Sequence, residues 1–315
     1  MPIVRLVRNY KFPEIARQSP GCSSEWKGYF FTEEEIPEAD YLVVLNYPLK
    51  DVNCKIKKGG SVLIVQEPPL ERNLYNREYF PYFDLVVSHF DFPKVKIIHE
   101  QAALPWHINL TYDQLLKSDV SSLEDKKDEV SWITSNINLF PAHQLRLNLI
   151  EHLKNTSIPF KLFGRGFNPI DDKIEVLKYS KYTIAAENFI GNDYWTEKIQ
   201  DAILSWNVPF YYGCPNLGKY LPSNSFIPVN IESPLDTVSE IELAMTGKFW
   251  DKNIDQLSEA RNIILNRLQF YPRLVNIIEQ LEVSNKRKNL FIPKDPFNKS
   301  LLHKLISKFK YGNGK

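Results

Sequence analysis

The sequence contains few of the residues that stabilise extracellular or metal-bound domains. Its 315 residues include three cysteines, Cys22, Cys54 and Cys214, and no two of them lie at the spacing of a metal-binding pair. Their number is also odd, so a disulfide framework is not expected. Cysteine usage of this kind fits a reducing compartment.

Long apolar runs and a strong charge of one sign are also missing. No stretch of 18 apolar residues occurs, and the N-terminus lacks the apolar core of a signal peptide. These absences favour a cytoplasmic protein without a membrane-spanning helix. The formal net charge of +1 gives no general case for binding nucleic acid.

The remaining composition is that of an ordinary soluble protein, with 43% hydrophobic and 24% charged residues in a chain long enough for two cores. In the N-terminal third, short apolar segments alternate with polar or aromatic connections. Strands are predicted at residues 4–7, 41–45, 62–65, 85–88 and 95–98. This pattern favours an open α/β sheet.

Residues 182–213 have the pattern of a strand, a helix and a second strand. Thr196 is predicted to cap a helix whose apolar side chains recur at helical spacing, namely Ile199, Ala202, Ile203 and Trp206. Strands are predicted on either side, at residues 182–185 and 208–212. A unit of this length implies two parallel strands joined by a right-handed crossover.

Polar side chains follow the first of these two strands. Glu187 and Asn188 come directly after it, and Asp193 and Tyr194 precede the helix. Ligands of such sheets bind beyond the carboxyl ends of the strands. The helix start adds free backbone N–H groups and a positive dipole, and Lys198 adds a full charge. We therefore expect an anionic group, above all a phosphate, to bind at this place.

Residues 187–229 resemble the signature of the α-1,3/4-fucosyltransferases, glycosyltransferase family ten. Their sequence is ENFIGNDYWTEKIQDAILSWNVPFYYGCPNLGKYLPSNSFIPV. In that family a Glu-Asn pair precedes Tyr-x-Thr-Glu-Lys, a helix, Val-Pro-x-x-x-Gly and Leu-Pro-x-x-Ser-Phe-Ile. Ala186, Phe189 and Trp195 depart from the usual residues of the pattern. The resemblance implies an α/β fold with two Rossmann-like domains facing across a cleft, the GT-B type.

The resemblance also implies a general base. In the family, a glutamate after a strand has this role, and Phe-Asp-x-x-x-Ser or Gly follows after a gap. Here Glu67 follows the predicted strand 62–65, and residues 83–88 contain the second motif. Glu67 is therefore implied to deprotonate the acceptor hydroxyl. Taken alone, it also fits a solvent-exposed loop glutamate.

The donor side of the resemblance includes an arginine early in a helix. A strand is predicted at residues 130–134 and a helix at 142–153, and Arg146 falls at the family's arginine position. A planar guanidinium can bind two phosphate oxygens, so Arg146 is implied to bind the diphosphate. Arg165, in a glycine-flanked turn, is a second candidate.

The other implied donor residues come from residues 187–198. Lys198 would stabilise the charge of the leaving GDP, and Glu197 would accept a hydrogen bond from the ribose or the donor sugar. Glu187, Asn188 and Tyr194 would shape the donor pocket. No Asp-x-Asp motif precedes this site, so we expect neither a metal nor a cofactor besides the substrate GDP-fucose.

Two further groups of residues have open interpretations. His89, Asp91 and His99 fit no tight metal-ligand pattern, and they suit the lining of an acceptor cleft or ordinary surface exposure. Trp106 and His107 follow a Leu-Pro turn. They could stack on a sugar face, or they could be packed at a domain junction.

Composition also predicts the domain organisation. Residues 113–130 are polar and charged and are typical of a linker. With the roles that the resemblance implies, we expect an acceptor-side α/β domain at residues 1–123 and a nucleotide-sugar-binding Rossmann-like domain at 124–283, followed by a basic amphipathic tail at 284–315. Within the tail, one helical face is predicted to carry Leu301, Leu302, Leu305, Ile306 and Phe309.

The basic tail leaves several alternatives open. An amphipathic helix of this kind suits an anionic membrane surface, which predicts peripheral attachment to the inner face of the membrane. Docking of the helix on the first domain and fraying of the terminus are the other two interpretations. Animal members of the family carry an N-terminal membrane anchor, so this chain resembles a bacterial, cytoplasmic form.

The resemblance implies inverting transfer of fucose from GDP-fucose to a hydroxyl of a glycan. The expected acceptor is an oligosaccharide or a lipid-linked glycan, such as a lipopolysaccharide intermediate, and no nucleic-acid partner is expected. Two alternatives remain from the residues themselves. One is a glycosyltransferase of the same fold that uses another nucleotide sugar, and the other is a catalytically idle sugar-binding module.

Overall fold

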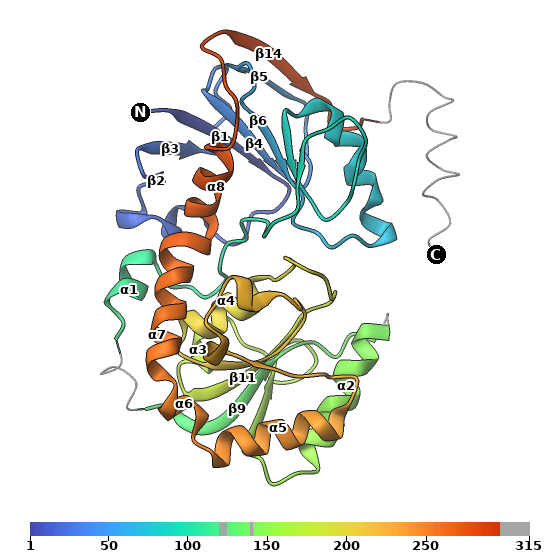
Figure 1. Cartoon of the computed structure of the whole chain (residues 1–315), viewed down its shortest axis with the longest axis vertical. Helices are drawn as coiled ribbons and strands as arrows, with labels where there is room; N and C mark the ends of the chain where they lie inside the picture. Colours follow the sequence, from blue (N-terminus) through green and yellow to red (C-terminus); the bar gives the residue numbers. More distant parts are fainter. Residues whose placement is uncertain (120–124, 139–140, 297–315) are drawn as a thin grey trace. The chain divides into compact units, whose positions relative to one another are not determined.

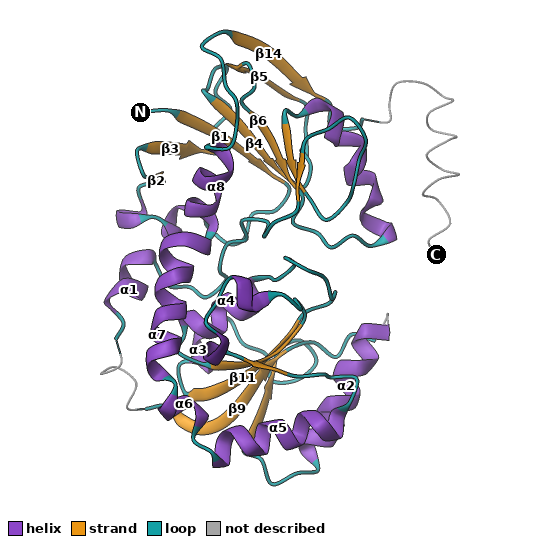
Figure 2. Cartoon of the chain, in the orientation of Figure 1, coloured by secondary structure: helices purple, strands orange, loops and turns teal. Residues whose placement is uncertain are grey.

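The computed structural model describes residues 1–119, 125–138 and 141–296. The chain forms two compact units, and Figures 1 and 2 show a sheet with helices in each. Unit 1 contains residues 1–104 and the segment from residue 270 onward, and unit 2 contains residues 105–269. The predicted α/β class with two Rossmann-like parts is confirmed, whereas the cleft between them stays a prediction.

Unit 1 is built on a seven-stranded sheet, counted over the described residues, in the order β2-β3-β1-β4-β6-β7-β8. The strands are β1 (Ile3–Arg8), β2 (Glu25–Trp26), β3 (Tyr29–Thr32), β4 (Tyr41–Leu45), β6 (Ser61–Ile64), β7 (Leu85–Val87) and β8 (Ile97–Ile98). All pairs are parallel except β2 with β3. Every residue of β4 and β6 is buried, as both faces of a parallel sheet must be covered.

Helical segments cover this sheet. They are the 3-10 segments Ala16–Gln18, Pro20–Cys22 and Glu71–Tyr82, and the helix α8 (Phe270–Ile278). Tyr271 of α8 packs its ring edge-on against Phe31 of β3, with the ring centroids 5.1 Å apart. A segment from the C-terminal part of the chain therefore completes the core of the N-terminal sheet.

A separate antiparallel pair, β5 (Val52–Lys57) with β14 (Arg287–Ile292), also belongs to unit 1. In β5, Val52, Cys54 and Ile56 are buried and alternate with outward polar residues. The predicted tail is therefore wrong for residues 287–292, because Leu290 and Ile292 join the hydrophobic core as part of a strand. The apolar helical face predicted from Leu301 onward lies outside the described residues.

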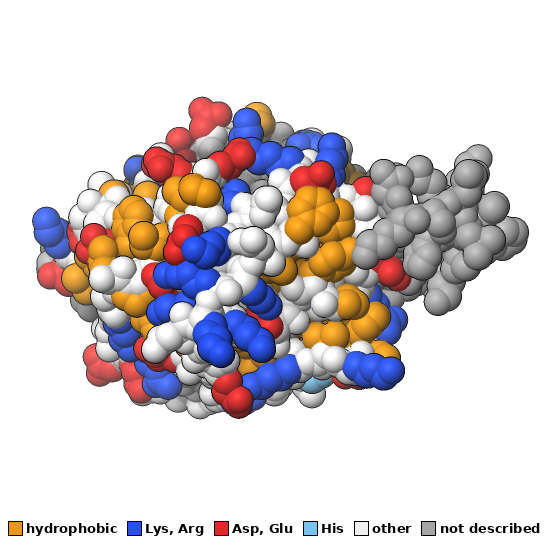
Figure 3. Space-filling view, turned by 90° about the horizontal axis from the view of Figure 1, so that it is seen from above, with side chains coloured by type: hydrophobic (Ala, Val, Ile, Leu, Met, Phe, Trp, Pro, Cys, Tyr) orange, Lys and Arg blue, Asp and Glu red, His pale blue; other side chains and the backbone are white. Residues whose placement is uncertain are grey.

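Basic side chains of β5 and β14 are paired with acids. Arg287 lies 3.0 Å from Asp40, Lys288 lies 3.0 Å from Asp84, and Lys55 lies 3.1 Å from Glu38. Figure 3 shows Lys and Arg side chains interspersed with Asp and Glu on the face seen from above. In the part of the tail that the structure describes, Arg287 and Lys288 are thus paired with acidic residues.

Unit 2 has a five-stranded sheet within the described residues, in the order β10-β9-β11-β12-β13, with every pair parallel. The strands are β9 (Lys127–Ile133), β10 (Phe160–Phe163), β11 (Ser180–Ala186), β12 (Val208–Tyr212) and β13 (Ile227–Pro228). The predicted strand at 208–212 is confirmed residue for residue. The strand predicted at 130–134 begins earlier and ends at Ile133.

The helices of unit 2 lie on both sides of this sheet (Figure 2). They are α1 (Tyr112–Lys117), α2 (Pro141–Lys154), α3 (Ile174–Leu177), α4 (Glu197–Leu204), α5 (Pro234–Thr246), α6 (Phe249–Lys252) and α7 (Ile254–Ile263), which continues as a π-helical turn (Ile264–Leu268). Short 3-10 turns follow β12 at Leu217–Lys219 and Ser223–Ser225. The predicted parallel pair and capped helix are confirmed, since β11 and β12 are parallel and α4 begins after the capping residue Thr196.

The unit boundaries differ from the predicted domain boundaries. The units divide at residues 104/105 and 269/270, whereas the sequence predicted 123/124 and 283/284. Residues 112–117 are not a solvated linker, because α1 has a capping box at Thr111 and buries Tyr112 and Leu115. Arg261 of α7 fixes the end of α1 with a 2.9 Å hydrogen bond to the Leu115 carbonyl.

Within the described residues, no helix is both long and apolar enough to cross a membrane.

Candidate functional site

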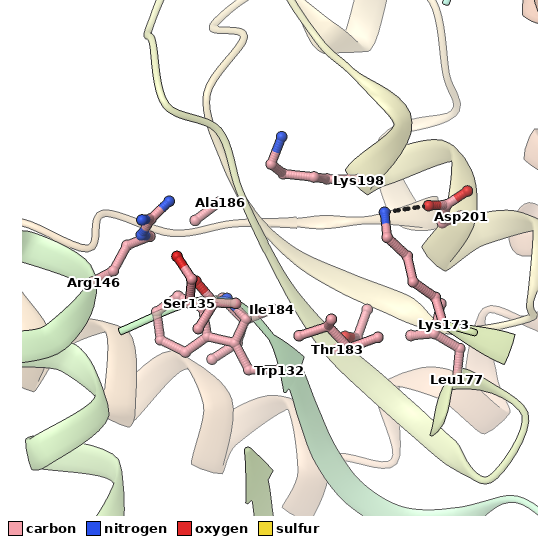
Figure 4. Close-up of a pocket in the computed structure, with 12 residues that line it drawn as sticks. Trp132, Ser135, Arg146, Lys173, Leu177, Thr183, Ile184, Ala186, Lys198 and Asp201 are labelled. Atoms are coloured by element: carbon pink, nitrogen blue, oxygen red, sulfur yellow. Dashed lines mark hydrogen bonds and ion pairs between the residues drawn. The ribbon is translucent and has the colours of Figure 1, made fainter. Parts of the chain in front are cut away.

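Unit 2 contains a cavity of about 200 Å³ at the carboxyl ends of β9 and β11 (Figure 4). Its lining combines apolar and hydroxyl side chains of the sheet with charged residues from the helices around it. The residues are Trp132, Ile133, Thr134, Ser135, Arg146, Lys173, Leu177, Thr183, Ile184, Ala186, Lys198 and Asp201. This is the edge of a parallel sheet at which ligands bind.

Arg146 lies on α2 at one side of the cavity (Figure 4). The residue is 7% exposed, and its Nη1 donates a 2.7 Å hydrogen bond to Oδ1 of Asn188. Its Nε is buried and has no hydrogen-bond partner among the described residues. Burial lowers the pKa of Arg146, but a guanidinium remains charged at neutral pH. A buried cation with an unused donor suits the oxygens of a phosphate group.

Lys198 enters the site from the first turn of α4. Its Nζ donates to Oε2 of Glu187 at 3.1 Å and to Oγ1 of Thr196 at 2.9 Å. Burial by itself lowers the pKa of Lys198, but the carboxylates of Glu187 and Glu197 outweigh burial and raise the pKa above its ordinary value. Lys198 is therefore a permanent cation beside the cavity.

Glu187 lies behind Lys198 and is not one of the residues found to line the cavity. It is 2% exposed, and Oε1 accepts a 2.7 Å hydrogen bond from the backbone N–H of Thr196. Oε2 accepts from the hydroxyl of Thr196 at 2.7 Å and from Lys198. Both carboxylate oxygens are thus used to fix the start of α4, so the residue contributes to the site through its neighbours.

A glycine after β12 makes room for this carboxylate. A Cβ atom at Gly213 would lie 2.6 Å from Cγ of Glu187 and 2.7 Å from the hydroxyl oxygen of Tyr211. Contacts this short would force Glu187 or Tyr211 to shift, so glycine is strongly favoured here. The contact explains why a glycine directly follows the strand β12.

The loop between β11 and α4 is held by Asp193, which has a positive φ of 62°. Its Oδ1 accepts hydrogen bonds from Tyr220 at 2.6 Å and from Asn216 at 2.9 Å. Tyr194 follows, buried, with its ring edge-on to Phe189 at a centroid distance of 5.3 Å. Neither Tyr194 nor Asn188 belongs to the lining found in the described chain, although Asn188 contacts the site through Arg146.

Sequence reasoning missed Lys173 and Asp201, which form an ion pair on the opposite side of the cavity from Arg146 (Figure 4). Nζ of Lys173 lies 2.6 Å from Oδ2 of Asp201 and 3.5 Å from Oε1 of Glu197. The same oxygen of Glu197 lies 3.6 Å from Nζ of Lys198. Asp201 is one turn after Glu197 on α4, a spacing that could have indicated it, but nothing in the sequence indicates Lys173.

Glu67 belongs to unit 1, where it follows β6 and is exposed. The preceding residue anchors it, because the backbone N–H of Gln66 donates to Oδ1 of Asn46 at 2.8 Å and its Nε2 donates to the Ala103 carbonyl at 3.1 Å. An exposed carboxylate on a fixed turn is accessible to an acceptor hydroxyl. Its role as a base stays a prediction.

The structure decides between the two interpretations of Trp106 and places His99 and Asp91 in contact. Trp106 is fully buried and its Nε1 donates to the Leu110 carbonyl at 3.0 Å, so it is a packed aromatic and does not stack on a sugar. His99 contacts Asp91 at 3.1 Å and the Ser88 carbonyl at 2.7 Å. No group of three potential metal ligands occurs in the described ranges.

Comparison with known families matches residues 123–247 to the family described as glycosyltransferase family 10 (fucosyltransferase), C-terminal part. A human 4-galactosyl-N-acetylglucosaminide 3-alpha-L-fucosyltransferase 9 is 34% identical over 139 residues, which are 42% of this chain and 36% of that protein. A fucosyltransferase-like protein of Arabidopsis thaliana is 27% identical over 188 residues, 58% of this chain and 35% of that protein. The chain thus spans about a third of the length of these relatives.

The fold has a counterpart among solved structures. A crystal structure of an alpha1,3-fucosyltransferase matches with a TM-score of 0.50 and 19% identity over 82% of this chain and 81% of the other. This likeness extends over both units and shows a GT-B type fold. The matched family segment contains the cavity together with Arg146, Lys173, Lys198 and Asp201. Residues 123–247 are therefore similar to the C-terminal part of glycosyltransferase family 10 (fucosyltransferase), and the chain has a fold of the GT-B type.

Proposed function

We propose that this chain is a glycosyltransferase that moves fucose from GDP-fucose to a hydroxyl of a glycan, with inversion at the anomeric carbon. One observation carries the proposal: within the family segment, Arg146 and Lys198 present two cations at a cavity beside the end of a parallel sheet. A nucleoside diphosphate is the type of ligand that such an arrangement favours.

The proposed reaction is a single displacement. The bond between the anomeric carbon and the β-phosphate oxygen breaks, and a bond from that carbon to the acceptor oxygen forms. Negative charge grows on the departing GDP, where Arg146, Lys198 and the N-terminus of α4 would stabilise it. These groups are fixed by Asn188, Glu187 and Thr196, so little reorganisation is needed during the reaction.

The acceptor proton must leave as the new bond forms. In the proposal it moves to the carboxylate of Glu67, which is exposed and held by the anchored residue Gln66. Inversion requires attack on the face opposite the departing GDP, so the base and the cations act on different sides of the sugar.

The acceptor is proposed to be a glycan with a galactose or N-acetylglucosamine unit. The human relative is named for a 4-galactosyl-N-acetylglucosaminide, which supports this class. A lipid-linked acceptor, a cytoplasmic location and membrane attachment through the tail are further proposals. Cosedimentation of the full chain with anionic vesicles tests the last of them.

A donor panel tests the reaction and separates it from its alternatives. The protein is incubated with GDP-fucose, GDP-mannose or a UDP-hexose and an array of glycans, and products are read by mass spectrometry. Product from GDP-fucose alone supports the proposal. Product only from another donor supports a different glycosyltransferase, for which Phe189 and Trp195 are the departures of interest. Calorimetric binding of GDP without any transfer would support a sugar-binding module.

A further inference from the structure

Lys173 and Asp201 form an ion pair at the cavity, and neither the family signature nor the proposed reaction gives this pair a role. Lys173 precedes α3, its side chain is 26% exposed, and Asp201 is 1% exposed. Both residues line the cavity (Figure 4). Removing two charges from water is unfavourable, so a pair at this place needs further stabilising contacts or a function.

Asp201 supplies the anchor of the pair. Its Oδ1 accepts hydrogen bonds from the backbone N–H of His107 at 2.7 Å and of Ile108 at 3.3 Å, and its Oδ2 receives Lys173 at 2.6 Å. The carboxylate is therefore fixed by donors from two other segments of unit 2. A lysine bound to such a group has little freedom to move.

The anchored ammonium of Lys173 acts on Glu197. Oε1 of Glu197 lies between two ammonium groups that line the cavity, 3.5 Å from Lys173 and 3.6 Å from Lys198. Burial alone would raise the pKa of Glu197, but Lys198, Lys173 and His107 outweigh it and hold the pKa well below its ordinary value. Glu197 is thus an ionised hydrogen-bond acceptor at neutral pH. It is not one of the residues found to line the cavity, but its side chain is 17% exposed and lies between two lysines that do line it.

We propose that Lys173, anchored by Asp201, is a positioning residue that holds the carboxylate of Glu197 in place to accept hydrogen bonds from the ribose hydroxyls of the donor nucleotide. This inference rests on the proposed function, because it requires that a nucleoside diphosphate occupies the cavity. Lys173 acts through Glu197 and does not itself touch the diphosphate. Its loss therefore weakens recognition of the ribose and leaves recognition of the phosphates unchanged.

The test is a thermodynamic cycle in which Lys173 is substituted in the protein and the ribose hydroxyls are deleted from the nucleotide. Isothermal titration calorimetry measures the affinity of GDP and of 2′,3′-dideoxy-GDP for the wild type, Lys173→Met and Lys173→Arg. Hydrogen bonds to a charged group are worth about 1.5–3 kcal/mol, so the wild type should prefer GDP by at least about 10-fold. In Lys173→Met the preference should fall to about 2-fold or less, with dideoxy-GDP affinity unchanged, and Lys173→Arg should restore part of it.

Two further variants keep the result interpretable. Lys173→Met leaves the Asp201 carboxylate without its cation. The double variant Lys173→Met/Asp201→Asn removes both charges and should also lose the preference for GDP over dideoxy-GDP. Lys161→Met is the matched control, because it removes an ion pair with Glu129 (2.7 Å) elsewhere in unit 2. That variant should keep the wild-type preference.

The outcomes distinguish the inference from the function on which it rests. If the wild type binds GDP and the Lys173 variants keep its preference over dideoxy-GDP, the positioning role is wrong while the proposed function stands. Equal weakening of both nucleotides would also overturn it, because Lys173 would then act on the phosphates or on folding. If the wild type binds neither nucleotide, the proposed function itself fails.

Discussion

At the scale of single residues, the site consists of buried carboxylates that hold lysines in place. Glu187 fixes Lys198 at 3.1 Å, and Asp201 fixes Lys173 at 2.6 Å. Each carboxylate also accepts backbone N–H groups, from Thr196 in one case and from the segment at residues 107–108 in the other. The cations therefore keep their positions when no ligand is bound, which lowers the cost of organising the site on binding.

Replacing Lys198 by alanine should remove one partner of the departing diphosphate. Loss of such a group costs about 2–4 kcal/mol of transition-state stabilisation, which is roughly a 30- to 1,000-fold decrease in kcat/KM. Steady-state kinetics with GDP-fucose measures this decrease, and calorimetry should show weaker GDP binding. Lys154→Ala is the control, because that lysine pairs with Glu151 on the exposed surface of α2, where an ion pair contributes little. Unchanged kinetics in Lys198→Ala would remove this residue from the mechanism.

Replacing Glu67 by glutamine keeps the shape of the side chain and removes its basicity. Turnover should fall by about 10²-fold or more, whereas GDP affinity should stay near that of the wild type. Because Glu67 is exposed, the substitution should leave the melting temperature unchanged. Near-normal turnover with correctly folded protein would show that another group takes the acceptor proton.

Some of these residues could be predicted from the sequence and others could not. Lys198 and Glu197 are neighbours within one motif, and Arg146 has a defined place in a helix, so their pattern is visible along the chain. Lys173 precedes α3 and Asp201 is on α4, so the two come together only in the folded chain, where the backbone of residues 107–108 also holds the Asp201 carboxylate. That contact depends on tertiary structure, and no local periodicity encodes it.

At the scale of elements, the best-predicted parts are those that bury both faces. The strands β4 and β12 are short runs of apolar residues with clear ends, and α4 has a capping threonine and apolar residues at helical spacing. The pair β5 and β14 was missed because each strand buries one face and carries charged residues on the other. In the sequence such strands resemble polar connections, because the partner strand with which each one pairs is more than 200 residues away in the chain.

The close approach of Gly213 to Glu187 gives a prediction at this scale. Gly213→Ala should displace the turn after β12 and lower the free energy of unfolding by about 1–3 kcal/mol, because the added methyl group would overlap the side chain of Glu187. Gly218→Ala is the matched control, since a Cβ there meets no atom within 4 Å. Urea denaturation compares the two variants. Equal stability of both would contradict the close contact.

At the scale of the whole molecule, the chain crosses between its two units twice, at residues 104/105 and 269/270. Alternation of strands and helices was enough to predict two parallel sheets. The boundaries could not be predicted, because polar composition at residues 113–130 resembles a linker whereas α1 packs within unit 2. The return of α8 and β14 to unit 1 likewise depends on which core buries them.

The lowered pKa values of carboxylates in both units predict how the free energy of unfolding depends on pH. Burial alone would raise the pKa of Asp84 and of Asp193, but hydrogen bonds from Ser61 and Lys288, and from Tyr220 and Asn216, lower both pKa values below the ordinary 3.8. A carboxylate whose pKa is lower in the folded state than in the unfolded state stabilises the protein at pH values above its unfolded-state pKa. This contribution to stability is lost as the pH falls through the folded-state pKa. The free energy of unfolding should therefore be level above about pH 5 and decrease below about pH 4.

Urea denaturation between pH 7 and pH 3 measures this dependence. Asp84→Asn, which also loses the 3.0 Å pair with Lys288, should flatten part of the decrease. Glu151→Gln is the control, because its carboxylate forms an ion pair only on the exposed surface of α2. A wild-type stability that stays constant down to pH 3 would contradict the ion pairs described here.

The central claim is that GDP-fucose is the donor and that the cations of the unit 2 cavity drive its reaction. The most direct measurement compares the wild type with the double variant Arg146→Ala/Lys198→Ala, using GDP-fucose, a galactosyl-N-acetylglucosamine acceptor and mass spectrometry of the product. The account predicts that the wild type adds one deoxyhexose to the acceptor, and that the folded double variant does so at least about 100-fold more slowly. A double variant as fast as the wild type, or a wild type that binds GDP but transfers fucose to no acceptor, would contradict it.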